Sequence, residues 1–359
     1  MQLDKTPVQF TGKAGEYFGI WIVNLLLSII TLGIYSAWAK VRRLKYFYNN
    51  TLIDGVGFDY HAKPMSILKG RIIAFLMFIA YTVLSRFSPL MGGLLLLALF
   101  LLTPWLIVRS MIFNARNTSH RGLRFDFSGS VGKAAIVFIV YPLLILVTLG
   151  LALPYVSQRS NKFLFENHQF GLSHFQSEAL VKDFYKIYLK LLGIIIGSII
   201  FFAVLGAVFS NSSAVSALTS LANPASAKDL LQSMSKFVFV LIAGVVLFYM
   251  VMLISLSAYI KSRTVNLIWN HTHIEHIGFQ STQRMRDLVF LNVTNMLAII
   301  FTVGLAAPWV HVRMARYKAE HLALTGEKDW DKFVGERKES ARALGGEMVD
   351  MFDMDISFG

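Results

Sequence analysis

Long stretches of hydrophobic residues, separated by short basic segments, dominate the chain. Seven stretches are nearly free of charge: residues 17–39, 72–85, 89–108, 134–156, 191–210, 237–260 and 288–310. Several reach the roughly 20 residues that an α-helix needs to cross a ~30 Å hydrocarbon core. The pattern predicts an all-α polytopic membrane protein with a membrane domain over residues 17–326. A polar N-terminus, residues 1–16, precedes this domain, and a cytoplasmic C-terminal tail, residues 327–359, follows it.

A recurring motif divides the membrane domain into five related units. In each unit an aromatic residue is followed four positions later by arginine, and eight residues further on by asparagine or histidine. The motif pairs are Trp38 and Arg42, Trp105 and Arg109, Tyr155 and Arg159, Tyr259 and Arg263, and Trp309 and Arg313. The polar residues are Asn50, Asn117, Asn167, His271 and His321. The motifs lie near residues 38–58, 105–125, 155–175, 259–279 and 309–330.

The units are of two kinds, which alternate along the chain. The first, third and fifth follow a single apolar stretch that ends in a break: Thr31-Leu32-Gly33, Thr148-Leu149-Gly150 and Thr302-Val303-Gly304. Asn24 and Asn295 each stand fourteen residues before a motif tryptophan. The second and fourth units follow two apolar stretches. This alternation predicts helix–break–helix elements in three units and pairs of longer helices in the other two.

The motif itself predicts a basic amphipathic helix at the membrane interface. Pro104, Pro154 and Pro308 immediately precede the aromatic residue, and proline suits the first turn of a helix. The spacing of four places the ring and the guanidinium on one helix face, within reach of a cation–π contact. Beyond the helix, apolar and polar residues alternate around glycine, which predicts short β-hairpins in the cytoplasm.

The basic residues leave two topologies open. Each motif is followed by lysines and arginines, so the positive-inside rule places all five motifs in the cytoplasm. Paired stretches satisfy this rule, since each pair leaves and returns. A single apolar stretch that crosses the membrane would place the segments before and after it on opposite sides. The three single stretches therefore either re-enter the membrane, which gives four spans, or cross it, which gives seven.

Composition agrees with a membrane location. Hydrophobic residues make up 55% of the chain and charged residues 15%, whereas soluble proteins carry about 25% charged residues. The formal net charge is +13, but the basic residues cluster beside apolar stretches, where they suit anionic lipid headgroups better than nucleic acid. The chain has no cysteine, so disulfides and thiolate metal sites are excluded.

Few residues suggest chemistry. His271, His273, Glu275 and His276 form the one histidine-rich cluster, a weak candidate for zinc that more simply belongs to a polar loop. The acidic residues Glu347, Asp350, Asp353 and Asp355 alternate with apolar ones, which favours a docking segment over a cation site. The sequence contains no nucleotide-binding loop, zinc-protease motif or nucleophile elbow. We expect neither an enzyme nor a cofactor.

The residues resemble a known family. The segment FTGKAGEYFGIWIVNLLLSIITLGIYSAWAKVRRLKYFYNNTLIDGVGFDYH, the segment RNTSHRGLRFDFSGS and the ending GGEMVDMFDMDISFG are similar to the YjgN-like family of bacterial inner-membrane proteins. The resemblance implies an inner-membrane location. It implies no activity, because that family has no established function.

Three classes of function fit these features. A transporter or pore for an unknown solute is the nominal prediction, since many transporters contain internal repeats. The alternatives are a lipid-headgroup-binding or envelope-homeostasis protein, in which the aromatic and arginine pairs contact anionic headgroups, and a membrane-anchored scaffold. Gly193 and Gly197 have the spacing of closely packed helices, within one chain or in a homo-oligomer.

Overall fold

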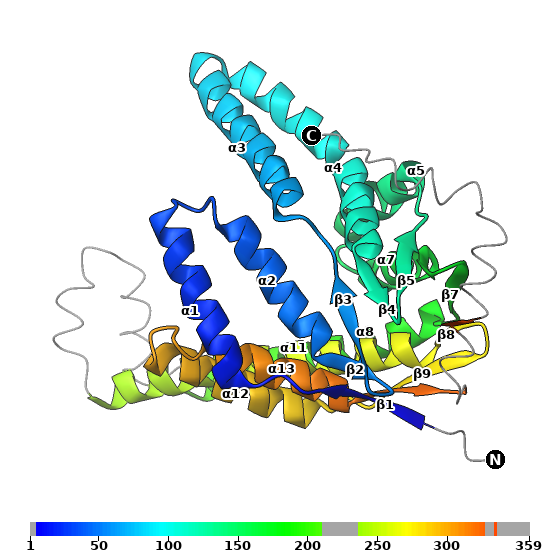
Figure 1. Cartoon of the computed structure of the whole chain (residues 1–359). Coiled ribbons are helices and arrows are strands. Elements are labelled where there is room, and N and C mark those ends of the chain that lie inside the picture. The colour runs from blue at the N-terminus through cyan, green and yellow to red at the C-terminus, as the bar shows by residue number, and fades with distance from the viewer. Residues whose placement is uncertain (1–4, 210–235, 327–333, 336–359) are drawn as a thin grey trace. The chain divides into compact units, whose positions relative to one another are not determined.

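The chain forms two compact units in the computed structural model, which describes residues 5–209, 236–326 and 334–335. The first unit contains residues 1–181, 265–283 and 298–359, and the second contains residues 182–264 and 284–297. Figure 1 traces the elements along the chain. The Ser/Ala-rich stretch 211–235 and nearly all of the tail, including Glu347, Asp350, Asp353 and Asp355, lie outside the described residues.

The elements follow one another in the same order five times: a strand, helices, and a second strand. The first group is β1 (Lys5–Phe10), α1 (Ala14–Ile30), α2 (Ser36–Asn49) and β2 (Thr51–Ile53). The second is β3 (Val56–Tyr60), α3 (Pro64–Phe87), α4 (Pro89–Arg116) and β4 (Thr118–His120). The third is β5 (Leu123–Phe127), α5 (Val131–Ala135), the π-helix η1 (Ile136–Val140), α6 (Tyr141–Val147), α7 (Leu153–Glu166) and β6 (His168–Phe170). The fourth is β7 (Ser173–Ser177), α8 (Val181–Phe209), α11 (Lys236–Asn270) and β8 (Thr272–Ile274). The fifth is β9 (Ile277–Ser281), α12 (Met285–Phe301), α13 (Ala307–Glu320) and β10 (Leu322–Thr325).

The strands close into one antiparallel barrel, in the order β1-β10-β9-β8-β7-β6-β5-β4-β3-β2. The prediction of an all-α protein is therefore wrong. Isolated hairpins were expected after each motif, but a hairpin of three-residue and five-residue strands leaves both its edges without hydrogen-bond partners. Closure of the barrel removes every edge. The first strand, β1, completes the ring by pairing with β10 on one side and β2 on the other.

Tight turns connect the strands within each hairpin. Asp54 and Gly55, between β2 and β3, have φ values of 51° and 73°, and Arg121 and Gly122, between β4 and β5, have 49° and 78°. Two consecutive residues with positive φ form the type I′ turn, whose twist matches that of the strands it joins. The Arg121 guanidinium also forms an ion pair with the Asp54 carboxylate at 2.8 Å, which joins two neighbouring turns.

Four helices in the described residues are long and apolar enough to cross a membrane: Pro64–Phe87, Pro89–Arg116, Val181–Val204 and Ala243–Asn270. The helices before the three sequence breaks are shorter or interrupted: Ala14–Ile30 and Val131–Val147 are apolar, and α12 ends at Phe301. In the second unit, α8 and α11 contact each other through stacked Phe202 and Tyr249, whose ring centroids are 5.2 Å apart.

The closed barrel bears on the choice between four spans and seven. Seven spans would place the hairpin β4–β5 and the hairpin β6–β7 on opposite sides of the bilayer. In the structure Phe125 of β5 pairs directly with Phe170 of β6. Paired strands lie on one side of a membrane, so this pairing favours the four-span topology, in which the three helix–break–helix elements return to the side from which they start.

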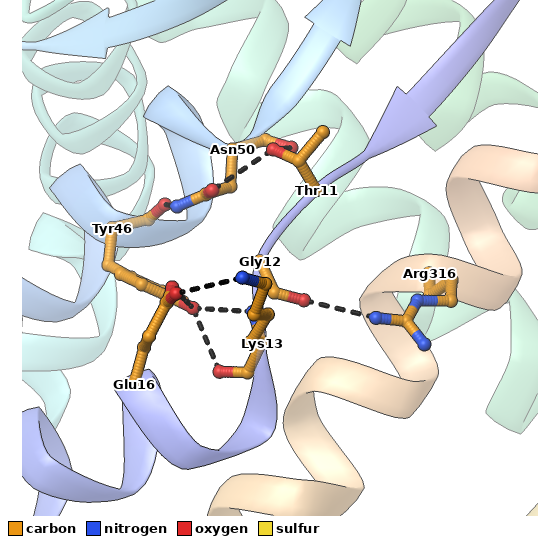
Figure 2. Close-up of polar contacts among 7 residues, drawn as sticks. All are labelled: Thr11, Gly12, Lys13, Glu16, Tyr46, Asn50 and Arg316. Carbon is orange, nitrogen blue, oxygen red and sulfur yellow. Dashed lines mark hydrogen bonds and ion pairs between the residues drawn. The ribbon is translucent and has the colours of Figure 1, made fainter.

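Polar contacts fix the junction at which β1 enters α1 (Figure 2). The Lys13 amide donates to the Tyr46 hydroxyl at 2.8 Å, and this hydroxyl donates back to the Lys13 carbonyl at 2.9 Å. The Arg316 guanidinium of α13 donates to the Gly12 carbonyl at 3.2 Å. The first strand is thereby attached to α2 and to α13, although Arg316 lies 304 residues from Gly12 in the sequence.

Candidate functional site

The aromatic and arginine pairs lie on the last helix of each group: α2, α4, α7, α11 and α13. Three pairs form cation–π contacts. The guanidinium carbon lies 5.7 Å from the ring centroid for Arg109 and Trp105, 5.1 Å for Arg159 and Tyr155, and 4.9 Å for Arg313 and Trp309. Trp105 and Trp309 are 45% and 43% exposed, which suits rings at a membrane interface. Tyr259 and Arg263 lie on α11.

Arg42 of the first group points elsewhere. Its Nη1 donates to Asn24 Oδ1 at 3.3 Å and to the Tyr35 hydroxyl at 3.1 Å. Asn24 is 7% exposed on α1, so this bond satisfies a buried amide and joins the two helices on either side of the break. Asn295, which has the same sequence spacing, is 5% exposed on α12.

The five polar residues after the motif share one structural position, the C-terminal end of the last helix in each group. Each side chain hydrogen-bonds to the carbonyl four residues earlier, at 2.7–2.9 Å. The residues are Asn50, Asn117, Asn167, His271 and His321. A helix leaves its last carbonyls without partners, and an amide N–H or an imidazole N–H can supply one. This shared geometry accounts for the exchange of asparagine for histidine.

Each break ends in an exposed apolar tip. Leu32, Leu149 and Val303 have φ near 50° and are 95%, 93% and 92% exposed. The threonine before each tip binds both sides of the break: the Thr31 hydroxyl donates to the Leu27 carbonyl at 2.7 Å and accepts from the Tyr35 amide at 2.9 Å. Thr148 and Thr302 make the equivalent bonds. The threonine hydroxyl thereby gives a partner to a backbone amide that the break leaves outside the helix ladder, which lowers the cost of bringing the break into the membrane.

A cationic pocket of about 280 Å³ lies beside the first break. One face of α1 and one face of α2 supply most of its wall, and α3 and α13 supply the rest. The lining residues are Tyr17, Trp21, Asn24, Leu25, Ser28, Ser36, Ala39, Lys40, Arg43, Arg71 and His311. Three of these are cationic, and none of the described lining residues is a carboxylate.

The charge in this pocket comes from Lys40, Arg43 and Arg71. Within the described residues, none of the three has a carboxylate at ion-pair distance, and Arg71 donates to the Ser36 hydroxyl. Burial, with a smaller contribution from the Arg43 guanidinium, lowers the pKa of His311 below its usual value of 6.5. His311 is therefore neutral at physiological pH and adds hydrogen-bonding capacity without charge. The pocket combines three cations, hydroxyl groups and the apolar surfaces of Trp21 and Leu25.

The four residues of the histidine-rich segment lie in different elements: the end of a helix, a strand and a turn. His271 directly follows the last residue of α11, whereas His273 lies in β8 with its Nε2 3.1 Å from Gln176 Oε1. Glu275 occupies the following turn, where it accepts a hydrogen bond from Ser173 at 2.5 Å. Successive residues of a strand point to opposite faces. No group of three potential metal ligands occurs in the described parts of the chain.

Two features of the first group, the strand β1 and the orientation of Arg43, were not predicted from the sequence. Residues 1–16 were assigned to a polar terminus, although Val8-Gln9-Phe10 resembles the later strand segments Phe58-Asp59-Tyr60 and Phe125-Asp126-Phe127. That similarity was the available signal for β1. The arginine motif also emphasised Arg42 rather than Arg43. Adjacent helical residues lie about 100° apart, so only the fold reveals which of the two faces a pocket.

Comparison with known proteins places the chain in a family. The sequence profile of a bacterial protein family of unknown function, DUF898, matches residues 5–351. The chain belongs to the DUF898 family. Its relatives include the inner membrane protein YjgN of Salmonella typhimurium, 33% identical over 149 residues, which are 41% of this chain and 38% of the relative. The YjgN proteins of Escherichia coli O157:H7 and strain K12 are 32% and 33% identical, over 39% of this chain and 36% of each relative.

These relatives confirm the resemblance to YjgN and the inner-membrane location. The matched stretch spans less than two fifths of each relative's length. Their shared name and the four long apolar helices identify this DUF898 chain as a multi-pass protein of the inner membrane. No solved structure matches the chain significantly.

Proposed function

We propose that this protein binds anionic phospholipid headgroups on the cytoplasmic side of the inner membrane. The cationic pocket supports the proposal, because Lys40, Arg43 and Arg71 line one cavity that has no described carboxylate in its wall. A site with three cations and no counter-charge among the described residues is complementary to a phosphate group. Arginine binds phosphate through paired N–H donors, and lysine binds it as a point charge.

The surroundings of the pocket suit a lipid better than a free anion. Trp21 and Leu25 supply apolar surface beside the cations, and Ser28 and Asn24 supply polar groups. The neighbouring tip at Leu32 is 95% exposed, as expected of a turn that enters the bilayer. A lipid headgroup would occupy the cationic end while its glycerol backbone contacts the apolar side chains.

We further propose that the chain consists of five related strand–helix–helix–strand units. The helix-end hydrogen bonds and the threonine bonds at the breaks recur at equivalent positions, which supports this description. In this proposal the basic last helices of the groups lie along the inner leaflet, with the motif rings at the interface. The positive-inside rule then places the barrel in the cytoplasm.

A lipid-binding comparison tests the proposal. Wild-type protein and the Arg43→Gln/Arg71→Gln variant would be placed in phosphatidylcholine nanodiscs with and without phosphatidylglycerol, and bound phosphatidylglycerol measured by native mass spectrometry. Each basic residue near a membrane surface contributes about 1 kcal/mol, so losing two should weaken binding roughly 30-fold.

Lys69→Gln is the matched control, because Lys69 is an exposed cation on α3 that does not line the pocket. It should retain wild-type binding. Equal binding by the double variant and the control would refute the headgroup site. Competition by free glycerol phosphate, without any effect of phosphatidylglycerol, would show a soluble anion as the ligand instead.

Transport of an unknown solute and scaffolding remain predictions from the sequence. Solute flux into sealed vesicles tests transport, and pull-down with the complete tail tests scaffolding. The headgroup proposal includes no catalytic step.

A further inference from the structure

Another pocket, of about 400 Å³, lies between the helices of the third group. The segment from α5 through η1 to α6 forms one wall, and α7 forms the other. Its lining residues include Lys133, Tyr141, Arg159, Lys162, Phe163 and Glu166. It shares no lining residue with the cationic pocket of the first group. The two pockets also differ in charge, because this wall carries a carboxylate besides its three cations.

Apolar contacts hold the two walls of this pocket together. Phe163 of α7 is 6% exposed and packs in one buried cluster with Ala134 of α5 and Val137 of η1. The Tyr141 ring of α6 meets the Tyr155 ring of α7 edge to face, with centroids 5.4 Å apart. One wall also contains the π-helix η1, and short π-helices within α-helices occur frequently at functional sites. The charged side chains therefore extend from a packed framework.

Two of the three cations, Lys133 of α5 and Arg159 of α7, come from opposite walls. Within the described residues, neither has a carboxylate at ion-pair distance. The Arg159 Nε is buried, so a ligand would use the N–H donors on the two terminal nitrogens of the guanidinium. Arginine binds phosphate through such paired donors, and lysine binds it as a point charge. A phosphate group in this pocket can therefore interact with both walls.

The carboxylate of the pocket, Glu166, has a weakly held partner. Lys162 lies 3.4 Å from it, four residues earlier on α7, and the two side chains are 37% and 39% exposed. Ion pairs with this exposure contribute little, because water solvates both charges. An ionised carboxylate accepts hydrogen bonds at two oxygens, with about four lone-pair sites. Glu166 can therefore accept from a ligand ammonium group in addition to Lys162.

The cation and the carboxylate follow a definite order along α7. Arg159 and Glu166 are seven residues apart, so they lie on one helix face, about 10 Å apart along the axis. The helix begins at Leu153, just after the exposed tip at Leu149, and ends beside β6. Arg159 is therefore nearer to the tip, and Glu166 is nearer to the barrel. A phospholipid with an amino headgroup has the same order, since its phosphate joins the glycerol and its amine extends beyond.

We propose that this pocket binds the zwitterionic phosphoethanolamine headgroup of a phospholipid, with the phosphate at Lys133 and Arg159 and the ammonium at Glu166. The proposal rests on the membrane placement of the tips given under the proposed function, but not on the cationic pocket. A primary ammonium has three N–H donors, whereas the quaternary ammonium of choline has none. The pocket therefore selects an amine-bearing headgroup over a choline headgroup.

Retention of phosphatidylethanolamine relative to phosphatidylcholine tests the proposal. The protein would be placed in nanodiscs with equal amounts of the two lipids and no phosphatidylglycerol, and each retained lipid counted by native mass spectrometry. Wild-type protein should retain one phosphatidylethanolamine per chain, with about a tenfold preference over phosphatidylcholine. Glu166→Gln, which removes only an exposed ion pair, should abolish this preference. Lys133→Gln should lower retention of both lipids, because both carry the phosphate.

Glu178→Gln is the matched control, because Glu178 is an exposed carboxylate that does not line the pocket. It should keep the tenfold preference. Equal retention of the two lipids by the wild-type protein would overturn the proposal, and this comparison holds even if a variant fails to fold. A preference that survives in Glu166→Gln would also overturn it. Competition by free glycerophosphoethanolamine, without retention of phosphatidylethanolamine, would overturn the assignment to a lipid.

The two lipid proposals can fail separately. Binding at the cationic pocket is measured with phosphatidylglycerol and depends on Arg43 and Arg71, whereas the preference for phosphatidylethanolamine depends on Glu166. Loss of one effect leaves the other measurable.

Discussion

The Thr11 amide donates to the Asn50 carbonyl at 3.0 Å, which joins the end of β1 to the end of α2. The same bond occurs in the other four groups, as His61 to Asn117, Ser128 to Asn167, Glu178 to His271 and Thr282 to His321. At each of these residues, the carbonyl anchors the neighbouring strand while the side chain caps its own helix. One residue therefore couples a helix to the barrel in every group.

Substitution of Asn50 tests this coupling. Asn50→Ala removes the side-chain bond to the Tyr46 carbonyl and the contact with the Thr11 hydroxyl. We expect a loss of about 1 kcal/mol of stability, visible as a lower midpoint of thermal unfolding in detergent. Asn50→His should stay close to wild type, because His271 and His321 make the same helix-end bond. Equal destabilisation by both substitutions would argue against the capping role.

The threonine at the first break provides a second prediction. Thr31→Val leaves the Tyr35 amide without the hydroxyl acceptor at 2.9 Å. This donor is part-buried, and a donor orphaned away from water costs about 1–3 kcal/mol, so the thermal midpoint should fall clearly.

Thr82→Val on α3 is the control for this substitution. The Thr82 hydroxyl donates to the Ile79 carbonyl and accepts no backbone amide in the described structure. Its loss should change the midpoint little. A Thr31→Val variant as stable as Thr82→Val would show that the hydroxyl is dispensable at the break.

His120 of β4 is 3% exposed, and its burial predicts a pH dependence of stability. Burial, and next the positive charge of Arg121, lower its folded pKa to about 4, below the ordinary value of 6.5, so the unfolded chain binds the proton more strongly. Stability should therefore decrease as the pH falls from about 6.5 towards about 4. From about pH 7 to about pH 5 the loss should be about 2 kcal/mol.

Comparison with His120→Phe separates the contribution of His120 to the pH dependence of stability from those of the other histidines. These include His311, whose pKa is also lowered. The difference in thermal midpoint between the two proteins should change with pH over this window. A constant difference would contradict a neutral, buried imidazole.

The apolar tips predict contact with hydrocarbon. Val147, which ends α6 beside the second break, is 79% exposed, whereas Leu172, in a barrel turn, is 42% exposed. A nitroxide on Val147→Cys should be relaxed more by oxygen than by a water-soluble nickel complex. A nitroxide on Leu172→Cys should show the reverse. Equal access of the nickel complex to both positions would mean that the tip lies in water.

Local features of the fold could be predicted from the sequence, and distant pairings could not. The break at Thr31-Leu32-Gly33 and the helix after it follow from residues that are close together. The barrel depends on pairs such as Thr6 and Leu324, which no local pattern connects, and its strands are only three to six residues long.

The candidate sites show the same limit. The arginine motif directed attention to Arg42, but Arg43 lines the pocket together with Arg71 from another helix. Lys133 and Arg159 likewise line one pocket from helices on either side of a break.

The central claim is that strands from all five groups form one barrel on one side of the membrane. Arg124 and His174 are exposed residues in the second and third hairpins, and the chain contains no native cysteine. Labelling of Arg124→Cys and His174→Cys with an impermeant maleimide, in intact cells and in inverted vesicles, tests the claim. Both cysteines should react only from the cytoplasmic side. Reaction of the two from opposite sides would contradict the barrel and restore seven spans.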